Sequence, residues 1–227
     1  NGFVGYNLEK FLHDHNYQIS GLLRKNKKAR LKSTKTYLDI GASRGSASIP
    51  FLDIFDKIIA FEPNIEACKE LSKVVLEKAP IHKDKIEVKN IALSNYDGKL
   101  EVEFGWTNPN FYIEPYKDNA QCTIIDSFNF KDVDFIKIDV EGEEFNVLMG
   151  AINTIKKYRP IILYEDKKNT SQLVKKGITY EENHKNINDF FENIGYITQR
   201  TKRTWRPMSA KGNYPKGDML AFSKNYL

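Results

Sequence analysis

The stretch Thr36-Tyr-Leu-Asp-Ile-Gly-Ala-Ser-Arg-Gly45 (TYLDIGASRG) decides the fold class of this chain. Its first five residues, Thr36–Ile40, predict a short buried strand, and the glycines that follow predict a tight turn. We expect the turn to open a helix over Gly45–Phe55, although Pro50 lacks the N–H group that a helix interior needs. Glycine lets a ligand approach the backbone, and a helix N-terminus offers free N–H groups. The stretch therefore predicts a strand, a ligand-binding turn and a helix, which together open an α/β sheet.

Short apolar runs alternate with helical patterns through the middle of the chain, which predicts βα units and a mostly parallel sheet. Further strands are expected at Lys57–Phe61, Ile86–Ile91, Phe135–Asp139, Pro160–Tyr164, Tyr196–Arg200 and Asp218–Ser223. Helices are expected from the cap at Glu62–Asn64 to about Lys78, over Glu143–Lys157 and over Ile187–Ile194. The expected fold class is α/β, a Rossmann-like doubly wound sheet of about seven strands with an inserted hairpin and an N-terminal extension.

The inserted hairpin is expected where Asn95–Gly98 (NYDG) forms a turn that leads into a strand over Lys99–Phe104. Three polar stretches, 105–121, 166–185 and 201–217, are predicted to be loops. Loops of this length in a compact domain are usually functional lids or disordered. Each of the three follows a core strand, so we expect them to contact the substrate.

The composition is that of a globular protein. The chain has 227 residues, of which 41% are hydrophobic and 29% are charged, with two cysteines. Two cysteines cannot build a disulfide scaffold, and no apolar run has the length of a membrane span. These observations favour a soluble, cytoplasmic protein.

The net charge of +5 is unevenly distributed. Residues 1–36 carry eight Lys/Arg and two Asp/Glu, and residues 199–227 carry seven and one, so an acidic body lies between two basic ends. Basic ends attract anionic partners such as nucleic acid, a nucleotide-sugar or a membrane surface, but they also simply keep a protein soluble. Nucleic acid is therefore an open partner class that the sequence does not favour.

Polar residues lie at the carboxyl ends of the first three predicted strands. Asp39 directly precedes the glycine turn and suits a ligand with a positive amino group. Glu62 ends the second strand, where a carboxylate can accept both hydroxyls of a ribose, or can cap the following helix. Asn90 ends the third strand, where its amide can bond an adenine edge, or can cap a turn. The glycine spacing of the turn, G-x-x-x-G, differs from the dinucleotide pattern and disfavours an NAD-binding domain.

The segment Lys137-Ile-Asp-Val-Glu-Gly142 has the highest density of such residues. Asp139 falls at the carboxyl end of a predicted central strand, where open α/β sheets bind ligands. Lys137 and Asp139 have the same strand parity, which predicts that they point to the same face. The next acids, Glu143 and Glu144, open a helix, where acidic residues are stabilising without any further role.

The sequence resembles the FkbM-type methyltransferases, class I enzymes that depend on S-adenosylmethionine (SAM). The resemblance covers residues 35–166, with a weaker match near Asp218–Phe222. It is carried by six blocks in order: YLDIGASRGSASIPF, IIAFEPN, IALSNYDGKLEVEF, CTIIDSF, DFIKIDVEGEEFNVLMGA and PIILYE. The KIDVEG block is the most specific. Known members methylate hydroxyl groups, often on sugars or polyketides.

The resemblance assigns roles to matching residues. It implies that Asp39, Gly41, Ser43 and Gly45 form the SAM turn, that Glu62 is the ribose-binding acid, and that Asn90, Ala92 and Leu93 lie where the family contacts adenine. It also implies that Asp139 and Glu141 form the acidic motif at the active-site edge. The chain departs from many class I enzymes at Ser43 and Arg44, where they have a second glycine, and this departure weakens the motif.

The function expected from these observations is SAM-dependent O-methylation of a small molecule or glycan, with a sugar as the favoured acceptor and S-adenosylhomocysteine (SAH) as the product. Asp139 or Glu141 is the expected catalytic base, and Lys137 the group that orients it or stabilises an alkoxide. No metal is expected, although Asp139, Glu141 and Glu165 offer oxygen ligands for a divalent cation. An RNA ribose O-methyltransferase and a non-catalytic SAM-fold binding module remain alternatives.

A second, fainter resemblance lies at the N-terminus. Residues Asn1–Arg24 are similar to the glycine turn, helix and second strand of a nucleotide-sugar epimerase, or match it by chance. We therefore expect residues 1–34 to be a basic extension from a fused domain of this kind and residues 35–227 to be the methyltransferase domain. On this interpretation the chain is part of a larger multidomain protein.

Overall fold

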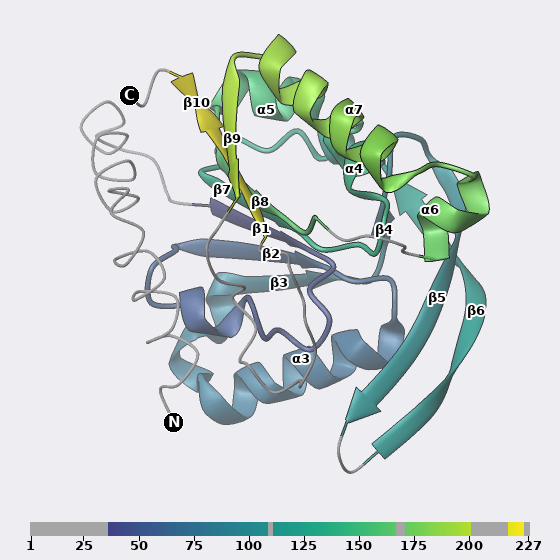
Figure 1. Ribbon diagram of the computed structural model, residues 1–227. Coiled ribbons are helices and arrows are strands. Elements are labelled where there is room, and N and C mark those ends of the chain that lie inside the picture. Colours follow the sequence, from purple (N-terminus) through teal and green to yellow (C-terminus); the bar gives the residue numbers. More distant parts are fainter. Residues whose placement is uncertain (1–35, 109–110, 167–170, 201–217, 225–227) are drawn as a thin grey trace.

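The computed structural model describes residues 36–108, 111–166, 171–200 and 218–224 (Figure 1). Its main element is a seven-stranded sheet with the order β3-β2-β1-β7-β8-β10-β9. The strands are β1 (Thr36–Ile40), β2 (Lys57–Phe61), β3 (Ile86–Lys89), β7 (Phe135–Ile138), β8 (Ile161–Tyr164), β9 (Tyr196–Arg200) and β10 (Met219–Ser223). Neighbouring strands are parallel except that β10 runs antiparallel to both β8 and β9. The predicted α/β class and the number of strands are confirmed.

Helices cover both faces of the sheet (Figure 1). On one face lie α4 (Glu144–Met149), α5 (Ile152–Tyr158) and α7 (Tyr180–Asn193), and on the other lies α3 (Ile65–Lys78). Side chains alternate along β1, so that Leu38 packs into the core with α4, α5 and α7 while Tyr37 packs against Phe51 on the opposite face. This arrangement brings the carboxyl ends of β1, β2 and β7 together at one edge of the sheet.

Helix α3 forms as its sequence predicts. Asn64 is its N-cap, and its side-chain oxygen accepts bonds from the backbone N–H groups of Glu66 and Ala67 at 2.9 and 3.2 Å. Such a cap satisfies N–H groups that have no partner within the helix. Leu71 and Val75 are buried between the helix and the sheet. The helix therefore holds the end of β2 in a fixed place.

The prediction of a helix over Gly45–Phe55 is wrong. Only a short 3₁₀ turn, η1 (Ile49–Phe51), forms there, with Pro50 in its first positions. Gly45 has a φ of +83°, which is outside the right-handed helical region. The segment between β1 and β2 therefore consists of turns that pack against one face of the sheet.

The single helix predicted over Glu143–Lys157 is divided into α4 and α5. The division lies at Gly150 and Ala151. A Cβ atom at Gly150 would lie 2.0 Å from the backbone oxygen of Ser94, so this position requires glycine. The acidic segment that follows β7 leads directly into the first residue of α4.

The stretch 105–121 belongs to a long hairpin rather than a loop. Strands β5 (Gly98–Asn108) and β6 (Phe111–Thr123) pair antiparallel and extend away from the core (Figure 1). The short strand β4 (Ala92–Leu93) pairs parallel with β6, giving the order β4-β6-β5. The turn at Asn95–Gly98 therefore precedes the hairpin and does not join two paired strands. Polar residues are compatible with a strand here because residues 117–119 and 121 are exposed.

The stretch 166–185 is also more regular than predicted. It contains α6 (Ser171–Lys176) and the first turns of α7, which begins seven residues before the predicted start at Ile187. Thr179 caps α7 by accepting a bond from the backbone N–H of Glu182 at 3.1 Å. The early start places the first turns of α7 near the end of β8.

The predicted N-terminal extension, 1–34, and the predicted loop 201–217 lie outside the described residues. Among the described helices, none is long and apolar enough to cross a membrane.

Candidate active site

The candidate site lies at the carboxyl edge of β1, β2 and β7, where open α/β sheets bind ligands. Gly41 follows β1 with a φ of +74°, and a Cβ atom there would lie 1.9 Å from the backbone oxygen of Asp139. The backbone N–H groups of Gly41 and Ala42 both donate to the carbonyl of Phe61, at 3.0 and 3.1 Å. The turn is therefore packed against the ends of both neighbouring strands, and only glycine fits at its first position.

Ser43 and Gly45 complete this turn. Both have positive φ values, +50° at Ser43 and +83° at Gly45. Ser43 occupies a left-handed conformation that glycine adopts more easily, so the serine accommodates the missing second glycine at some backbone cost. Its side chain is exposed. The departure from the glycine pattern thus leaves the turn intact.

Glu62 is fixed by backbone groups on both sides. Its carboxylate accepts bonds from the N–H of Ser43 at 2.9 Å and from the N–H of Asn64 at 2.8 Å. The side chain is buried, and burial raises the pKa of Glu62, although these two bonds and the charge of Lys137 oppose the shift. A carboxylate held in this way keeps lone pairs for two further donors, as a vicinal diol offers.

Asp39 has no exposed surface. The hydroxyl of Ser48 donates to one of its carboxylate oxygens at 2.6 Å, and the Lys137 ammonium lies 3.3 Å from the other. Sequence reasoning did not identify Ser48, because it lies in a segment that the pattern predicts to be an ordinary helix. Asp39 therefore lies beneath the glycine turn, within a charged hydrogen-bonded group.

Lys137 links the glycine turn to Asp139. Its ammonium donates to the carbonyl of Gly41 at 3.0 Å and lies 3.6 Å from the Asp139 carboxylate. Lys137 is 3% exposed, so it lies within the floor of the site. The predicted common orientation of Lys137 and Asp139 agrees with this contact.

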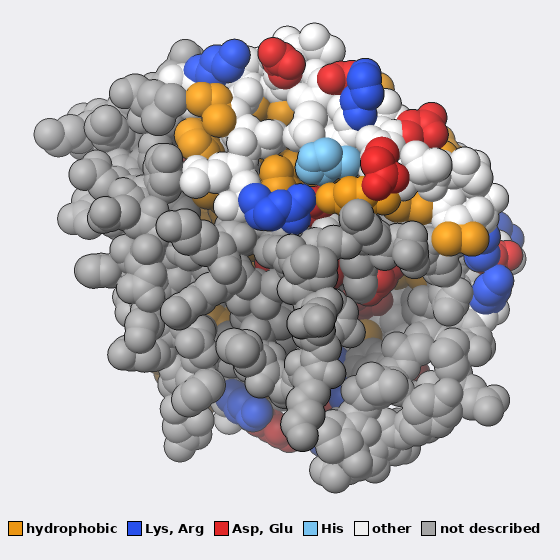
Figure 2. Space-filling view, in the orientation of Figure 1, with side chains coloured by type: hydrophobic (Ala, Val, Ile, Leu, Met, Phe, Trp, Pro, Cys, Tyr) orange, Lys and Arg blue, Asp and Glu red, His pale blue; other side chains and the backbone are white. Residues whose placement is uncertain are grey.

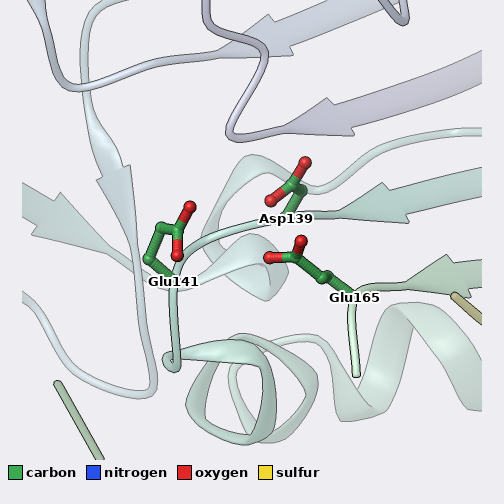
Figure 3. A group of neighbouring side chains, drawn as sticks. All are labelled: Asp139, Glu141 and Glu165. Carbon is green, nitrogen blue, oxygen red and sulfur yellow. The ribbon is translucent and has the colours of Figure 1, made fainter. Parts of the chain in front are cut away.

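Three carboxylates gather beside the turn. Asp139 comes from the end of β7, Glu141 from the following turn and Glu165 from the end of β8 (Figure 3). One oxygen from each lies within 4.8 Å of the others, and the three side chains point toward one another. Carboxylates this close can share a proton or bind a divalent cation. The cluster places proton-accepting groups next to the glycine turn.

Glu143 and Glu144 do more than open a helix. Both are buried, and the Glu144 carboxylate accepts bonds from the N–H groups of Gly142 at 3.2 Å and Val140 at 3.3 Å. Burial raises the pKa of Glu144 to about 7, although hydrogen bonds oppose the shift. Glu143 binds Asn146 and the ammonium of Lys176. Glu144 therefore holds the acidic turn in shape.

The residues predicted to contact adenine make contacts within the protein. The amide nitrogen of Asn90 donates to the backbone carbonyls of Glu62 and Pro63 at 3.0 and 2.8 Å. Ala92 and Leu93 form β4, and their side chains are buried. Contact of these three residues with adenine remains a prediction.

A polar cluster that the sequence did not reveal lies beyond β8. Buried Asp166 accepts a bond from Tyr180 at 2.8 Å, pairs with Arg200, and lies 3.2 Å from the Nδ1 atom of His184. These residues come from α7 and β9, and their separation along the chain left no motif to find. On this side of the molecule, near α7, acidic and basic side chains are interspersed (Figure 2).

Comparison with known proteins agrees with this geometry. A family model described as "Methyltransferase FkbM domain" matches residues 39–198, which include the glycine turn, Glu62 and the acidic cluster. The chain belongs to the FkbM methyltransferase family. The predicted family is thus confirmed, and membership supports SAM as the cofactor. No curated protein matches the chain significantly.

Solved structures show that the chain has the class I methyltransferase fold. The FkbM methyltransferase from Methylobacillus flagellatus KT is 17% identical with a TM-score of 0.57, over 86% of this chain. The present chain spans 46% of that protein, about half its length. An O-methyltransferase from Bacillus cereus, solved in complex with SAH, is 13% identical with a TM-score of 0.50, over 99% of this chain and 91% of that one.

The residues of this site fit an adenosyl cofactor. The Glu62 carboxylate is oriented by two backbone N–H groups, as binding of a ribose diol requires. Gly41 keeps the turn free of a Cβ atom at the edge of the sheet. Asp39, Lys137 and Asp139 supply charged groups next to that turn. The donor set therefore suits a cofactor that carries a ribose and an amino acid group.

Proposed function

We propose that the protein is a SAM-dependent O-methyltransferase that acts on a hydroxyl group of a small molecule or glycan, with a sugar as the favoured acceptor and SAH as the product. One observation carries the proposal. The carboxylates of Asp139, Glu141 and Glu165 lie within 4.8 Å of one another beside the Gly41 turn. A hydroxyl acceptor must lose a proton, and these carboxylates lie where a proton acceptor is needed.

Three groups of this chain would hold the cofactor. Glu62 accepts the ribose hydroxyls, because its carboxylate is fixed but keeps free lone pairs. The Gly41 turn lets the methionine part approach the backbone. Asp39 provides negative charge under the turn for the amino group. Bound SAM supplies a methyl group that is already activated by its sulfonium.

The protein then has to align the acceptor and remove its proton. The acceptor oxygen forms a bond to the methyl carbon as the carbon–sulfur bond breaks, and the hydroxyl proton passes to Asp139 or Glu141. Lys137 lies 3.6 Å from the Asp139 carboxylate and orients it. Because Lys137 is buried, we assign it this orienting role in preference to contact with an alkoxide.

A thermal-shift titration with SAM, SAH and NAD tests the cofactor assignment. A ligand at 100 times its dissociation constant stabilises a protein by about 2.7 kcal/mol. We expect SAM and SAH to raise the unfolding temperature and NAD to leave it unchanged. No shift with either SAM or SAH would overturn the proposed function.

Labelled SAM with a panel of free sugars, nucleotide-sugars, polyols and RNA tests the acceptor class. Transfer of label to a sugar hydroxyl, lost in Asp139→Asn, is the expected result. Transfer only to RNA, or only to nitrogen, would overturn the proposed acceptor while leaving the cofactor assignment in place.

A further inference from the structure

The side chain of Asn90 joins the ends of β2 and β3 next to Glu62. Its amide nitrogen donates to the carbonyl oxygen of Glu62 at 3.0 Å and to that of Pro63 at 2.8 Å. It also lies 3.7 Å from the sulfur of Cys68. A primary amide has two N–H bonds, and two carbonyls already accept from them. The nitrogen of Asn90 therefore has no hydrogen left to donate to a ligand.

Glu62 is held at each of its polar atoms. Its N–H donates to the carbonyl of Lys89 at 3.0 Å, and its carboxylate accepts from Ser43 and Asn64. Its carbonyl accepts from Asn90 and from the thiol of Cys68 at 3.1 Å. The contact from Asn90 ties the carbonyls of Glu62 and Pro63 to the residue that follows β3, next to the backbone bond between Glu62 and Lys89. Release of this contact would loosen the carbonyl groups of Glu62 and Pro63, which belong to the segment that carries the carboxylate.

We propose that Asn90 is a positioning residue that holds Glu62 in place for the ribose hydroxyls of the cofactor, and that it is not a ligand of adenine. This inference rests on the proposed function, because it takes an adenosyl compound as the ligand. A carboxylate that accepts two hydroxyls at once needs a fixed direction, and supporting hydrogen bonds provide it.

Calorimetric titration of three ligands distinguishes a positioning role of Asn90 from contact with adenine. The ligands are SAH, its 2′-deoxy analogue, and an analogue in which hypoxanthine replaces adenine. The proteins are the wild type, Asn90→Ala, Asn90→Asp, and the control Asn153→Ala, which changes an exposed asparagine on α5. Asn90 is exposed, so its replacement leaves no cavity in the core.

We expect the wild type and Asn153→Ala to lose affinity about tenfold when the 2′-hydroxyl is removed, which is the value of a hydrogen bond to a charged group. In both Asn90 variants the loss of affinity on removal of the 2′-hydroxyl shrinks to about twofold or less. The loss of affinity on replacement of adenine by hypoxanthine stays at the wild-type value. A general structural defect would weaken all three ligands equally and would not change these ratios.

The variant Asn90→Asp is the most informative, because it keeps a side-chain acceptor and removes both donors. If Asn90 recognises adenine through its oxygen, Asn90→Asp keeps the penalty for removal of the 2′-hydroxyl. An unchanged ribose penalty in the two Asn90 variants, or a lost hypoxanthine penalty, would overturn the proposal.

A second measurement needs no cofactor. Burial raises the pKa of the Cys68 thiol to about 11, and the thiol lies against Glu62 and Asn90, so iodoacetamide should alkylate it slowly. We expect faster alkylation of Cys68 in Asn90→Ala, where removal of the side chain uncovers the thiol, with the other buried cysteine, Cys122, unchanged as an internal reference. An unchanged rate at Cys68 would overturn the proposal. If the wild type binds no SAH, the proposed function fails, and the alkylation rates still decide whether Asn90 holds this segment.

Discussion

The ammonium group of Lys137 lies 3.3 Å from the carboxylate of Asp39, and both side chains are almost completely buried. The two residues are register partners on the adjacent parallel strands β1 and β7. The same ammonium reaches the carbonyl of Gly41 and the carboxylate of Asp139. One buried cation therefore connects the glycine turn to the acidic edge of the site.

Replacement of Lys137 by methionine should strongly destabilise the protein. The change leaves the buried Asp39 carboxylate without its cation, and removal of one partner from a buried ion pair costs about 3–5 kcal/mol. Urea unfolding measures this loss. Lys73→Met, on the exposed face of α3, is the matched control and should change stability by about 0.5 kcal/mol or less. Equal effects of the two substitutions would show that the buried cation has no special role.

Gly41→Ala should disrupt both the fold and cofactor binding, because the new Cβ atom would lie 1.9 Å from the backbone oxygen of Asp139. Gly177→Ala is the matched control. Gly177 also has a positive φ, +64°, but a Cβ atom added there would meet no neighbouring atom within 4 Å. Both variants carry the left-handed backbone cost of about 1–2 kcal/mol. Urea unfolding and SAH titration should show a larger loss for Gly41→Ala, and equal losses would contradict the close approach to Asp139.

The stability of the protein should depend on pH through Glu144. Its pKa is raised from 4.5 to about 7, so the folded state binds the proton more tightly than the unfolded state. The stabilisation that this gives is complete below about pH 4.5 and is lost as the pH rises to 7. Glu144→Gln removes this dependence, and relative to the wild type the variant should gain about 3 kcal/mol between pH 4.5 and 8.

Urea unfolding across this pH range tests the Glu144 prediction. Glu66→Gln, at an exposed position in the first turn of α3, should show no such change relative to the wild type. Parallel stability curves for Glu144→Gln and the wild type would mean that Glu144 is ionised throughout.

Asp139→Asn should reduce turnover more than it reduces SAM affinity. Loss of a general base lowers the rate by about 10²–10⁴-fold, while the cofactor contacts of Glu62 are left in place. The measurement is transfer of labelled methyl to the acceptor that the panel identifies, together with calorimetric titration of SAH. Glu141→Gln, a neighbour in the same cluster, shows which carboxylate takes the proton. Full activity in Asp139→Asn would remove Asp139 from this role.

Local patterns predicted the strands of the main sheet well. Thr36–Ile40, Lys57–Phe61 and Tyr196–Arg200 form with the predicted bounds, because short apolar runs between turn residues have few alternatives in a buried sheet. The hairpin of β5 and β6 was not predicted over its full length. Residues 99–104 alternate and were predicted as a strand, but the polar and aromatic stretch 105–121 lacks the clear alternation that marks a strand with one buried face.

Local patterns predicted less of the site. The contact between Lys137 and Asp139 follows from strand parity within one element, so it could be predicted. The hydrogen bonds of Asp39 and Asn90 join elements that only the folded chain brings together. The bond from Ser48 to Asp39 is an example. The cluster around Asp166 could not be predicted for the same reason, because its partners lie 14 to 34 residues further along the chain.

The position of β10 has a consequence for biosynthesis. This strand lies between β8 and β9, although it follows both of them in the sequence. Until the ribosome has released Met219–Ser223, the inner edges of β8 and β9 have no hydrogen-bonding partner in their final places. The nascent chain therefore exposes two open strand edges until this segment emerges, and unpaired edges invite association with other chains. A chaperone that shields them would act before Met219–Ser223 leaves the ribosome.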